Sequence, residues 1–140
     1  IMLFQGGYHG SVFTFSGGPN LNNVDGIFFL GHREIELSDE QKKDLLAFVH
    51  DDGKGFVSAH TATTAFLAWP EFGEMLGGRY DNHPWNTVEA PIVNEAPDFP
   101  ATKHFPATFE FNDEYYQPKE YSRDKLDVLL RIQAEGIAAD

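Results

Sequence analysis

Three histidines and a glutamate are the residues whose types and positions best suit chemistry. His9, His60, His83 and Glu114 each follow or flank a segment whose hydrophobic pattern predicts a strand. An imidazole titrates near neutral pH, so it serves as an acid, a base or a metal ligand, and a carboxylate serves as a base or an oxygen ligand. Brought together at one edge of a sheet, the four groups could bind a divalent metal, or they could form a proton-transfer pair around a sugar.

Each candidate also has a purely structural interpretation. A single histidine after a strand is more often a hydrogen-bonded loop residue than a ligand. The spacing of the four candidates matches no compact metal motif, and Glu114 could belong to a solvated turn with Asp113. The nearby aromatic residues could pack in the core or form a wall for a sugar ring, with core packing favoured for at least one tryptophan; they are Trp69, Trp85, Tyr115 and Tyr116.

The element that must position His60 is predicted by residues 53–64. Gly53 ends a helix, Gly55–Ala59 is a short apolar run typical of a strand, and His60 follows at once, before small residues that lead into a helical stretch. A strand that breaks into a helix in this way carries its turn residue at the carboxyl edge of a sheet. Ligands of α/β proteins bind at that edge.

A strand, a helix and a second strand precede this turn. Ile27–Leu30 is a fully apolar run, and a helix begins after Ser38, which forms a capping box with Gln41 three residues on. Gly53 is the expected left-handed residue after this helix. A strand–helix–strand unit from Ile27 to Ala59 predicts that its two strands are parallel.

The rest of the chain predicts two short helical pieces and further strands. The helical pieces are Thr63–Trp69 and Glu71–Leu76, broken by Pro70, and residues 81–85 are predicted to form a loop. Strands are predicted at Ile1–Phe4, Val12–Phe15, Thr87–Val93, Thr108–Phe111 and Val128–Ile132, with a proline-rich loop over 94–106. We therefore expect one α/β domain with a mainly parallel sheet flanked by helices.

Composition excludes several classes of partner and chemistry. The formal net charge of −12 disfavours nucleic acid and anionic membranes, which repel an acidic surface. No apolar run is long enough to span a bilayer, so we expect a soluble protein. Its compartment is left open between the cytoplasm and a periplasmic or secreted location. The chain has no cysteine, which excludes disulfides and thiolate catalysis.

Several motifs in series resemble the trehalose-utilisation (ThuA-like) family. They are G-K-G-F-V-S-A-H-T-A-T at residues 53–63, W-P-E-F-G-E-M-L-G-G-R-Y at 69–80, N-H-P-W at 82–85 and F-N-D-E-Y-Y at 111–116. The resemblance runs from about Leu21 to Ile132 in the family's order, and Gly6-Gly7-Tyr8-His9 is similar to the family's first-strand motif.

The resemblance implies a fold and excludes one reaction. The fold would be a flavodoxin-like three-layer α/β sandwich with a mainly parallel sheet, similar to class I glutamine amidotransferases. Those enzymes carry a cysteine at the turn after the strand, whereas this turn carries His60 and the chain has no cysteine. Hydrolysis of glutamine by a thiol is therefore excluded.

The resemblance also implies sugar chemistry and assigns residues to it. The expected activity is proton transfer or isomerisation on a trehalose-like or oxidised (keto) disaccharide, with a small-molecule carbohydrate as partner and a homo-oligomer left open. The resemblance implies that His9, His60, His83 and Glu114 line the pocket, with Tyr115 and Trp85 near it. In the expected reaction His60 is the general base or a metal ligand, Glu114 is the partner acid or second ligand, and His83 is the third catalytic residue, which positions the substrate or completes a metal site. Substrate binding is expected of His9, Trp85 and Tyr115. A divalent metal, if bound, would use His9, His60, His83 and Glu114.

Two alternatives stand beside this function, and two departures stand against a complete family domain. The alternatives are a non-catalytic carbohydrate-binding domain of a larger protein and a metal-assisted glycoside or ester hydrolase.

The family usually has a first helix and a second strand where this chain has only eleven residues between His9 and Leu21. The family domain also continues past the position of Ile132. We expect a single ThuA-like domain over 1–140 that lacks a segment between residues 10 and 20 and another after 132.

Overall fold

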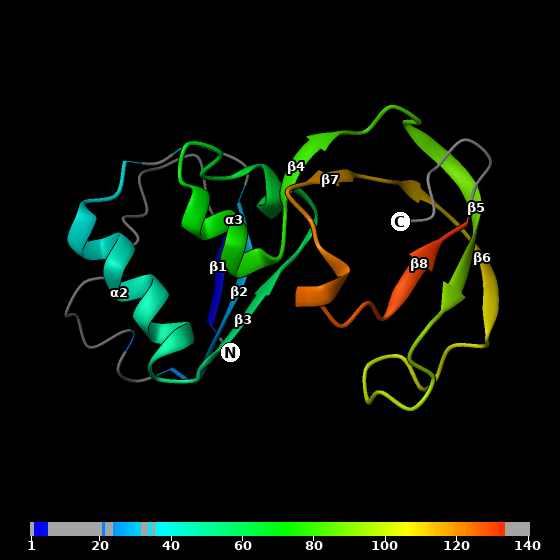
Figure 1. The fold of residues 1–140 in the computed structure, drawn as a ribbon, viewed down its shortest axis with the longest axis horizontal. Coiled ribbons are helices and arrows are strands. Elements are labelled where there is room, and N and C mark those ends of the chain that lie inside the picture. The colour runs from blue at the N-terminus through cyan, green and yellow to red at the C-terminus, as the bar shows by residue number, and fades with distance from the viewer. Residues whose placement is uncertain (1, 6–20, 22–23, 32–33, 35, 134–140) are drawn as a thin grey trace. The chain divides into compact units, whose positions relative to one another are not determined.

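The computed structural model describes residues 2–5, 21, 24–31, 34 and 36–133. The chain divides into two compact units, Ile1–Arg79 (unit 1) and Tyr80–Asp140 (unit 2), and each is described by itself (Figure 1). The described residues form a mixed α/β structure with three small sheets. No helix in this part of the chain combines the length and the apolar character that crossing a membrane requires.

Unit 1 contains a parallel sheet. Strands β1 (Met2–Gln5), β2 (Gly26–Leu30) and β3 (Gly55–Ser58) lie in the order β1-β2-β3, and both neighbouring pairs are parallel. Ile27 lies opposite Phe56 in the β2–β3 register. The predicted strand–helix–strand unit is thus confirmed, because a helix of the expected length connects β2 to β3. The strand predicted at Val12–Phe15 lies outside the described residues.

The connecting helix, α2 (Asp39–His50), begins and ends as the sequence predicts. The Ser38 hydroxyl accepts a hydrogen bond from the Gln41 backbone N–H, and the Gln41 side chain accepts one from the Ser38 N–H, which completes the capping box. Gly53 has a φ of 64°, in the left-handed region that a residue with a Cβ enters only at a cost.

Aromatic residues dominate the core of unit 1. Phe48, Phe72 and Leu45 are its most deeply buried large side chains. Five rings pack in edge-to-face, tilted or stacked pairs with centroids 5.0 to 6.0 Å apart; they belong to Phe29, Phe56, Phe66, Trp69 and Phe72. Core packing of one tryptophan is therefore confirmed, since Trp69 is only 6% exposed.

The segment after β3 differs from the two helical pieces that were predicted. A 3-10 helix, η1, spans His60–Thr64, and no regular helix follows it up to Trp69, so the predicted piece Thr63–Trp69 is wrong. Pro70 does not break a helix. It occupies the first turn of α3 (Pro70–Leu76), where its missing N–H leaves no hydrogen bond unmade.

The main sheet of unit 2 is antiparallel. Strands β5 (Thr87–Asn94), β6 (Thr108–Glu114) and β8 (Leu130–Ile132) lie in the order β6-β5-β8, and both pairs are antiparallel. The expectation of a mainly parallel sheet therefore holds for β1–β3 and not for unit 2. The reason is local: no helix connects β5 to β6, and without a crossover element the chain returns antiparallel.

A second, two-stranded sheet pairs β4 (Arg79–Asn82) with β7 (Gln117–Lys119). The predicted loop at residues 81–85 is corrected here, because Asp81 and Asn82 are the end of β4. The Lys119 ammonium lies 3.5 Å from the Asp81 carboxylate. A short 3-10 helix, η2 (Arg123–Lys125), precedes β8.

The loop between β5 and β6 is held by buried polar side chains, as a loop without regular hydrogen bonds requires. The Asn94 amide nitrogen donates to the backbone oxygens of Thr102, at 3.0 Å, and Phe105, at 3.4 Å. The Asn94 amide oxygen accepts from the Ala96 N–H at 3.1 Å. Asn94 and Thr102 are only 8% and 3% exposed, so this loop is anchored rather than loosely attached.

Candidate functional site

His83 lies in the turn that leads from β4 into β5. Its backbone N–H donates to the Asn82 side-chain oxygen at 2.8 Å, and its carbonyl accepts from the Asn86 N–H at 3.2 Å. Asn86 has a φ of 50°, a left-handed conformation that asparagine tolerates better than most residues. The chain therefore reverses over 83–86 and enters β5 at Thr87.

Glu114 is brought to this turn by strand register. It is the last residue of β6, and the antiparallel pairing places it opposite Thr87, the first residue of β5. Its carboxylate oxygen Oε1 lies 3.8 Å from Nδ1 of His83, and the two side chains are 30% and 41% exposed. That distance is too long for a direct hydrogen bond, so the imidazole and the carboxylate are neighbours with a gap between them.

Two tyrosines border the His83–Glu114 pair. The Tyr80 ring, on β4, packs edge to face on the Tyr116 ring at 5.1 Å, and the His83 ring lies 6.0 Å from Tyr80 and 5.9 Å from Tyr116. Burial raises the pKa of Tyr116, and a hydrogen bond to Glu114 raises it further. Unit 2 thus contains a half-exposed cluster of one acid, one imidazole and two phenols.

Tyr115 and Trp85, the aromatic residues that the resemblance assigns to substrate binding, lie in the same unit. The Tyr115 hydroxyl donates to the backbone oxygen of Phe111 at 2.6 Å. Burial, with the nearby charges of Asp113 and Glu110, raises the pKa of Tyr115. Trp85 is half-buried within the turn that carries His83. A role for either in binding a sugar stays a prediction.

His60 occupies the turn after β3, as the sequence predicts. It has a φ of 49°, and a residue with a Cβ enters this region at a cost of roughly 1–2 kcal/mol. Its carbonyl accepts a hydrogen bond from the Thr63 hydroxyl at 3.1 Å, and Ala62, two residues on, is fully buried. Such strain is retained where the surrounding packing enforces it, and it is frequent at functional sites.

The four predicted residues are therefore placed in three different ways. The structure brings His83 and Glu114 together in unit 2 and holds His60 on a strained turn of unit 1. His9 lies outside the described residues. Within the described part of the chain, no three His, Asp or Glu side chains are grouped closely enough to hold a metal ion, and a metal site that includes His9 stays a prediction.

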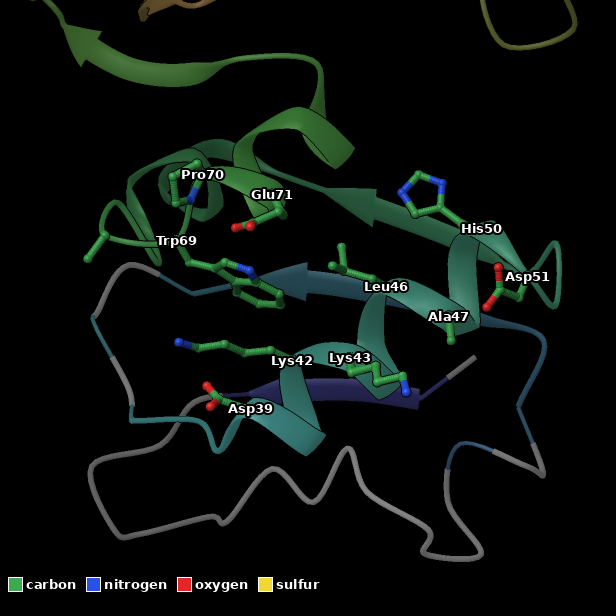
Figure 2. A pocket seen from close by; sticks show the side chains of 11 residues that line it. Asp39, Lys42, Lys43, Leu46, Ala47, His50, Asp51, Trp69, Pro70 and Glu71 are labelled. Carbon is green, nitrogen blue, oxygen red and sulfur yellow. The ribbon is translucent and has the colours of Figure 1, made fainter.

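Unit 1 also carries a surface groove of about 540 Å³, which none of the predicted site residues lines. Figure 2 shows its walls, formed by α2 on one side and by Trp69, Pro70 and Glu71 on the other. The Lys42 ammonium lies 5.8 Å from the centre of the Trp69 ring. The charged side chains along the groove are of both signs, so it favours neither anionic nor cationic ligands.

Sequence reasoning named Tyr116 only as one of several aromatic residues and did not select Tyr80. The signal for Tyr80 was its place two residues before Asn82, on the strand that leads into His83. The signal for Tyr116 was its position directly after Glu114-Tyr115. Neither signal is informative without the pairing of β4 with β7. Tyr80 lies on β4 and Tyr116 directly precedes β7, so this pairing brings the two tyrosines together.

Comparison with solved structures first defines the class of fold. The chain is similar to a ThuA-like protein from Bacteroides uniformis ATCC 8492, with a TM-score of 0.67 and 24% sequence identity over 87% of this chain and 52% of that one. At this identity the likeness shows the mixed α/β fold alone. The chain spans about half the length of that protein.

The family follows from the sequence match. The family described as ThuA, trehalose utilisation, matches residues 10–139. The chain therefore belongs to the ThuA trehalose-utilisation family. A comparison with curated proteins gave no match.

Proposed function

We propose that this chain belongs to a sugar-processing enzyme that moves a proton next to the carbonyl group of a keto-disaccharide. Membership of the trehalose-utilisation family supports a sugar substrate. The observation that carries the proposal is the His83–Glu114 pair, 3.8 Å apart and bordered by Tyr80 and Tyr116. Family likeness also favours a flavodoxin-like sandwich, to which β1–β3 and α2 contribute the parallel part.

Isomerisation next to a carbonyl needs a base, an acid and a stabilised oxygen. One member of the pair removes the carbon-bound proton, and the electrons of that C–H bond form the C=C bond of an enediolate. The carbonyl oxygen then carries the negative charge. Return of a proton to the same carbon regenerates the substrate with its hydrogen exchanged, whereas protonation of the former carbonyl carbon, with the α-hydroxyl proton moved to the former carbonyl oxygen, gives the isomer. A tyrosine hydroxyl or a divalent metal at this oxygen would stabilise the charge.

His60 is the second candidate base or ligand in this proposal. Its strained turn at the carboxyl end of β3 supports a functional role, because the same conformation would be cheaper with glycine. His9 would take part in substrate or metal binding, as the resemblance implies. Neither assignment is needed for the proton transfer by His83 and Glu114.

The test is exchange of carbon-bound hydrogen in heavy water. The full chain is incubated with a disaccharide that carries a ketone, and incorporation of deuterium next to the carbonyl is followed by NMR. His83→Gln and Glu114→Gln are each expected to slow exchange by about 10²- to 10⁴-fold. The matched control is His104→Gln. The His104 side chain is exposed, and its ring centroid lies 4.1 Å from that of Phe105. Equal exchange in all four proteins would overturn the proposal.

A non-catalytic carbohydrate-binding domain is favoured by one observation, the half-exposed tyrosine wall. Aromatic rings bind the apolar faces of sugars without any titrating pair. Calorimetry separates the two functions: a binding domain keeps its affinity in the His83→Gln/Glu114→Gln variant and loses it in Tyr116→Ala. Metal analysis of protein purified without chelators tests the metal-assisted hydrolase, which requires stoichiometric metal.

A further inference from the structure

The groove of unit 1 is lined by a tryptophan that the core holds in place. The Trp69 ring stacks on Phe72 with centroids 5.5 Å apart and packs edge to face on Phe66 at 5.8 Å, and the residue is only 6% exposed. Its backbone N–H donates to the Phe66 oxygen at 2.8 Å, and its carbonyl accepts from the Phe72 N–H at 3.2 Å. Such packing leaves the ring little freedom, so the part of Trp69 that reaches the groove has a defined position.

The indole N–H of Trp69 makes no hydrogen bond with any residue that the structure describes. It is nevertheless open to solvent, because each fully buried side-chain nitrogen and oxygen in the described ranges has a hydrogen-bond partner. Trp69 lines the groove, so the N–H is accessible from there. An indole nitrogen can only donate, and an oxygen atom of a ligand in the groove would complete its hydrogen bonding.

Charged side chains of both signs surround this donor. In Figure 2 the Trp69 ring lies between the side chains of Lys42, from α2, and Glu71, from α3. The Lys42 ammonium is 5.8 Å from the centre of the ring, and Asp39 precedes Lys42 by about one helical turn. Carboxylates accept hydrogen bonds, whereas the ammonium and the indole donate them. This end of the groove therefore offers a ligand both donors and acceptors.

These charges limit the class of ligand. Asp39 and Glu71 would repel an anion, and Lys42 would repel a cation. A hydroxyl group both donates and accepts, so a neutral sugar could donate to the carboxylates while its oxygens accept from the ammonium and the indole N–H. Leu46 and Pro70 add apolar surface to the lining, which suits the C–H faces of a sugar ring.

We propose that the groove of unit 1 binds a neutral sugar, at a site that shares no residue with the His83–Glu114 pair of unit 2. The groove volume of about 540 Å³ lies within the range of roughly 300–1,000 Å³ that is typical of small-molecule sites. Because the family is described by trehalose utilisation, trehalose, a neutral disaccharide, is the probe. The inference does not depend on the proposed proton transfer, since it requires binding and no turnover.

The two units carry one tryptophan each, so each candidate site contains its own reporter. The ¹⁵N-labelled full chain is titrated with trehalose, and the indole N–H signals are followed by NMR, with Trp85→Phe assigning them. The Trp69 signal is expected to shift and to saturate, because a sugar oxygen accepts from its N–H. A Trp69 signal that stays in place, or drifts without saturating, would overturn the inference. A saturating shift of Trp85 alone would also overturn it, and would place the sugar beside His83, as the proposed function requires.

Two substitutions test the side chains that bind the sugar. Lys42→Met keeps the aliphatic stem and removes the ammonium, and Glu71→Gln keeps the shape and removes the charge. Each should weaken trehalose binding about 10-fold, because a hydrogen bond to a charged group is lost or made neutral. The matched controls are Glu74→Gln, on the same helix and outside the groove lining, and Lys103→Met, exposed in unit 2. Equal affinities in all four variants would overturn the site.

A last titration separates a sugar from a zwitterion, which also carries groups for both kinds of charge. Glycine betaine has opposite charges and no hydroxyl group. It should leave the Trp69 signal in place at concentrations at which trehalose saturates the shift. A signal that betaine moves as far as trehalose does, or further, would overturn the assignment of the groove to a sugar.

Discussion

The two units hold their candidate histidines by different physical means. In unit 1, His60 is fixed through its backbone: the turn is anchored by the fully buried Ala62, and the rings of Phe66 and Phe72 pack nearby in the core. In unit 2, His83 and Glu114 are fixed by strand register and by polar or aromatic neighbours, and the pair itself is partly exposed. A site set by core packing should tolerate changes in charge. A site positioned by polar contacts should be perturbed when a single hydrogen-bonding or charged atom is removed.

The largest expected effect comes from removing a core ring from unit 1, and this substitution is the first test of the comparison. Phe72 is 1% exposed and contacts four other rings, so Phe72→Ala should lower the free energy of unfolding by about 3–5 kcal/mol. Denaturant unfolding followed by Trp69 fluorescence measures the loss, in a Trp85→Phe background that leaves one tryptophan. Val57→Ala, at a position 55% exposed, is the control and should change little. Equal effects of the two variants would contradict the assigned core.

Unit 2 should depend instead on a buried amide. Asn94→Ala leaves the carbonyls of Thr102 and Phe105 without their donor, which should cost about 1–3 kcal/mol of unfolding free energy. Chemical denaturation followed by Trp85 fluorescence, in a Trp69→Phe background, reports on this unit. Asn112→Ala, on the exposed part of β6, is the matched control. An Asn94→Ala protein as stable as the control would show that the loop does not rely on this side chain.

The left-handed backbone at His60 predicts a smaller effect on stability, in which glycine at this position is more stable than alanine. At a φ of 49°, glycine is tolerated better than alanine, so His60→Gly should be more stable than His60→Ala by about 1 kcal/mol. Both variants lack the imidazole, so the difference isolates the backbone. Thermal unfolding of the pair measures it. If alanine proved equal or better, the left-handed conformation at residue 60 would be refuted.

The smallest predicted effect is the pH dependence of an ion-pair cluster in unit 2. Hydrogen bonds from Arg131 and Arg123 lower the pKa of Glu95 from its ordinary value of 4.5. A depressed carboxyl pKa contributes stability above the unfolded value, and that contribution is lost as the pH falls through the folded pKa. The stability difference between the wild type and Glu95→Gln should therefore be constant near neutral pH and shrink below about pH 4.5.

The control for this pH series is Glu110→Gln, on an exposed position of β6. This variant removes one carboxylate and leaves the hydrogen bonds of Glu95 with Arg123 and Arg131 in place. A Glu95→Gln protein whose disadvantage grows as the pH falls would contradict the sign derived from the lowered pKa. Salt should weaken the Glu95 effect, because these side chains are partly exposed.

Local signals predicted unit 1 well. The capping box at Ser38, the left-handed Gly53 and the turn at His60 are all encoded within a few residues, and the structure contains each of them. The error at Thr63–Trp69 has a tertiary cause. Ala65, Phe66 and Trp69 are all buried, and Phe66 adopts a φ of 52°, so core packing overrides the helical pattern.

Long-range pairing explains what the sequence could not predict in unit 2. The strands β5 and β6 were predicted, but nothing local specifies that Thr87 pairs with Glu114, which lies 27 positions later. The meeting of His83 with Glu114 follows only from that register. The positions of Tyr80 and Tyr116 beside His83 depend on a third pairing, between β4 and a short strand, β7, that no hydrophobic pattern indicates.

The central claim is that His83 and Glu114 act as one proton-transfer unit, and a double-mutant cycle on deuterium exchange tests it most directly. Exchange rates of His83→Gln, Glu114→Gln and the double variant are compared with the wild type. Groups that act as a unit are not additive, so the double variant should exchange about as slowly as the slower single variant. A double variant slowed by the product of the two single losses would show that the residues act independently and would contradict the account.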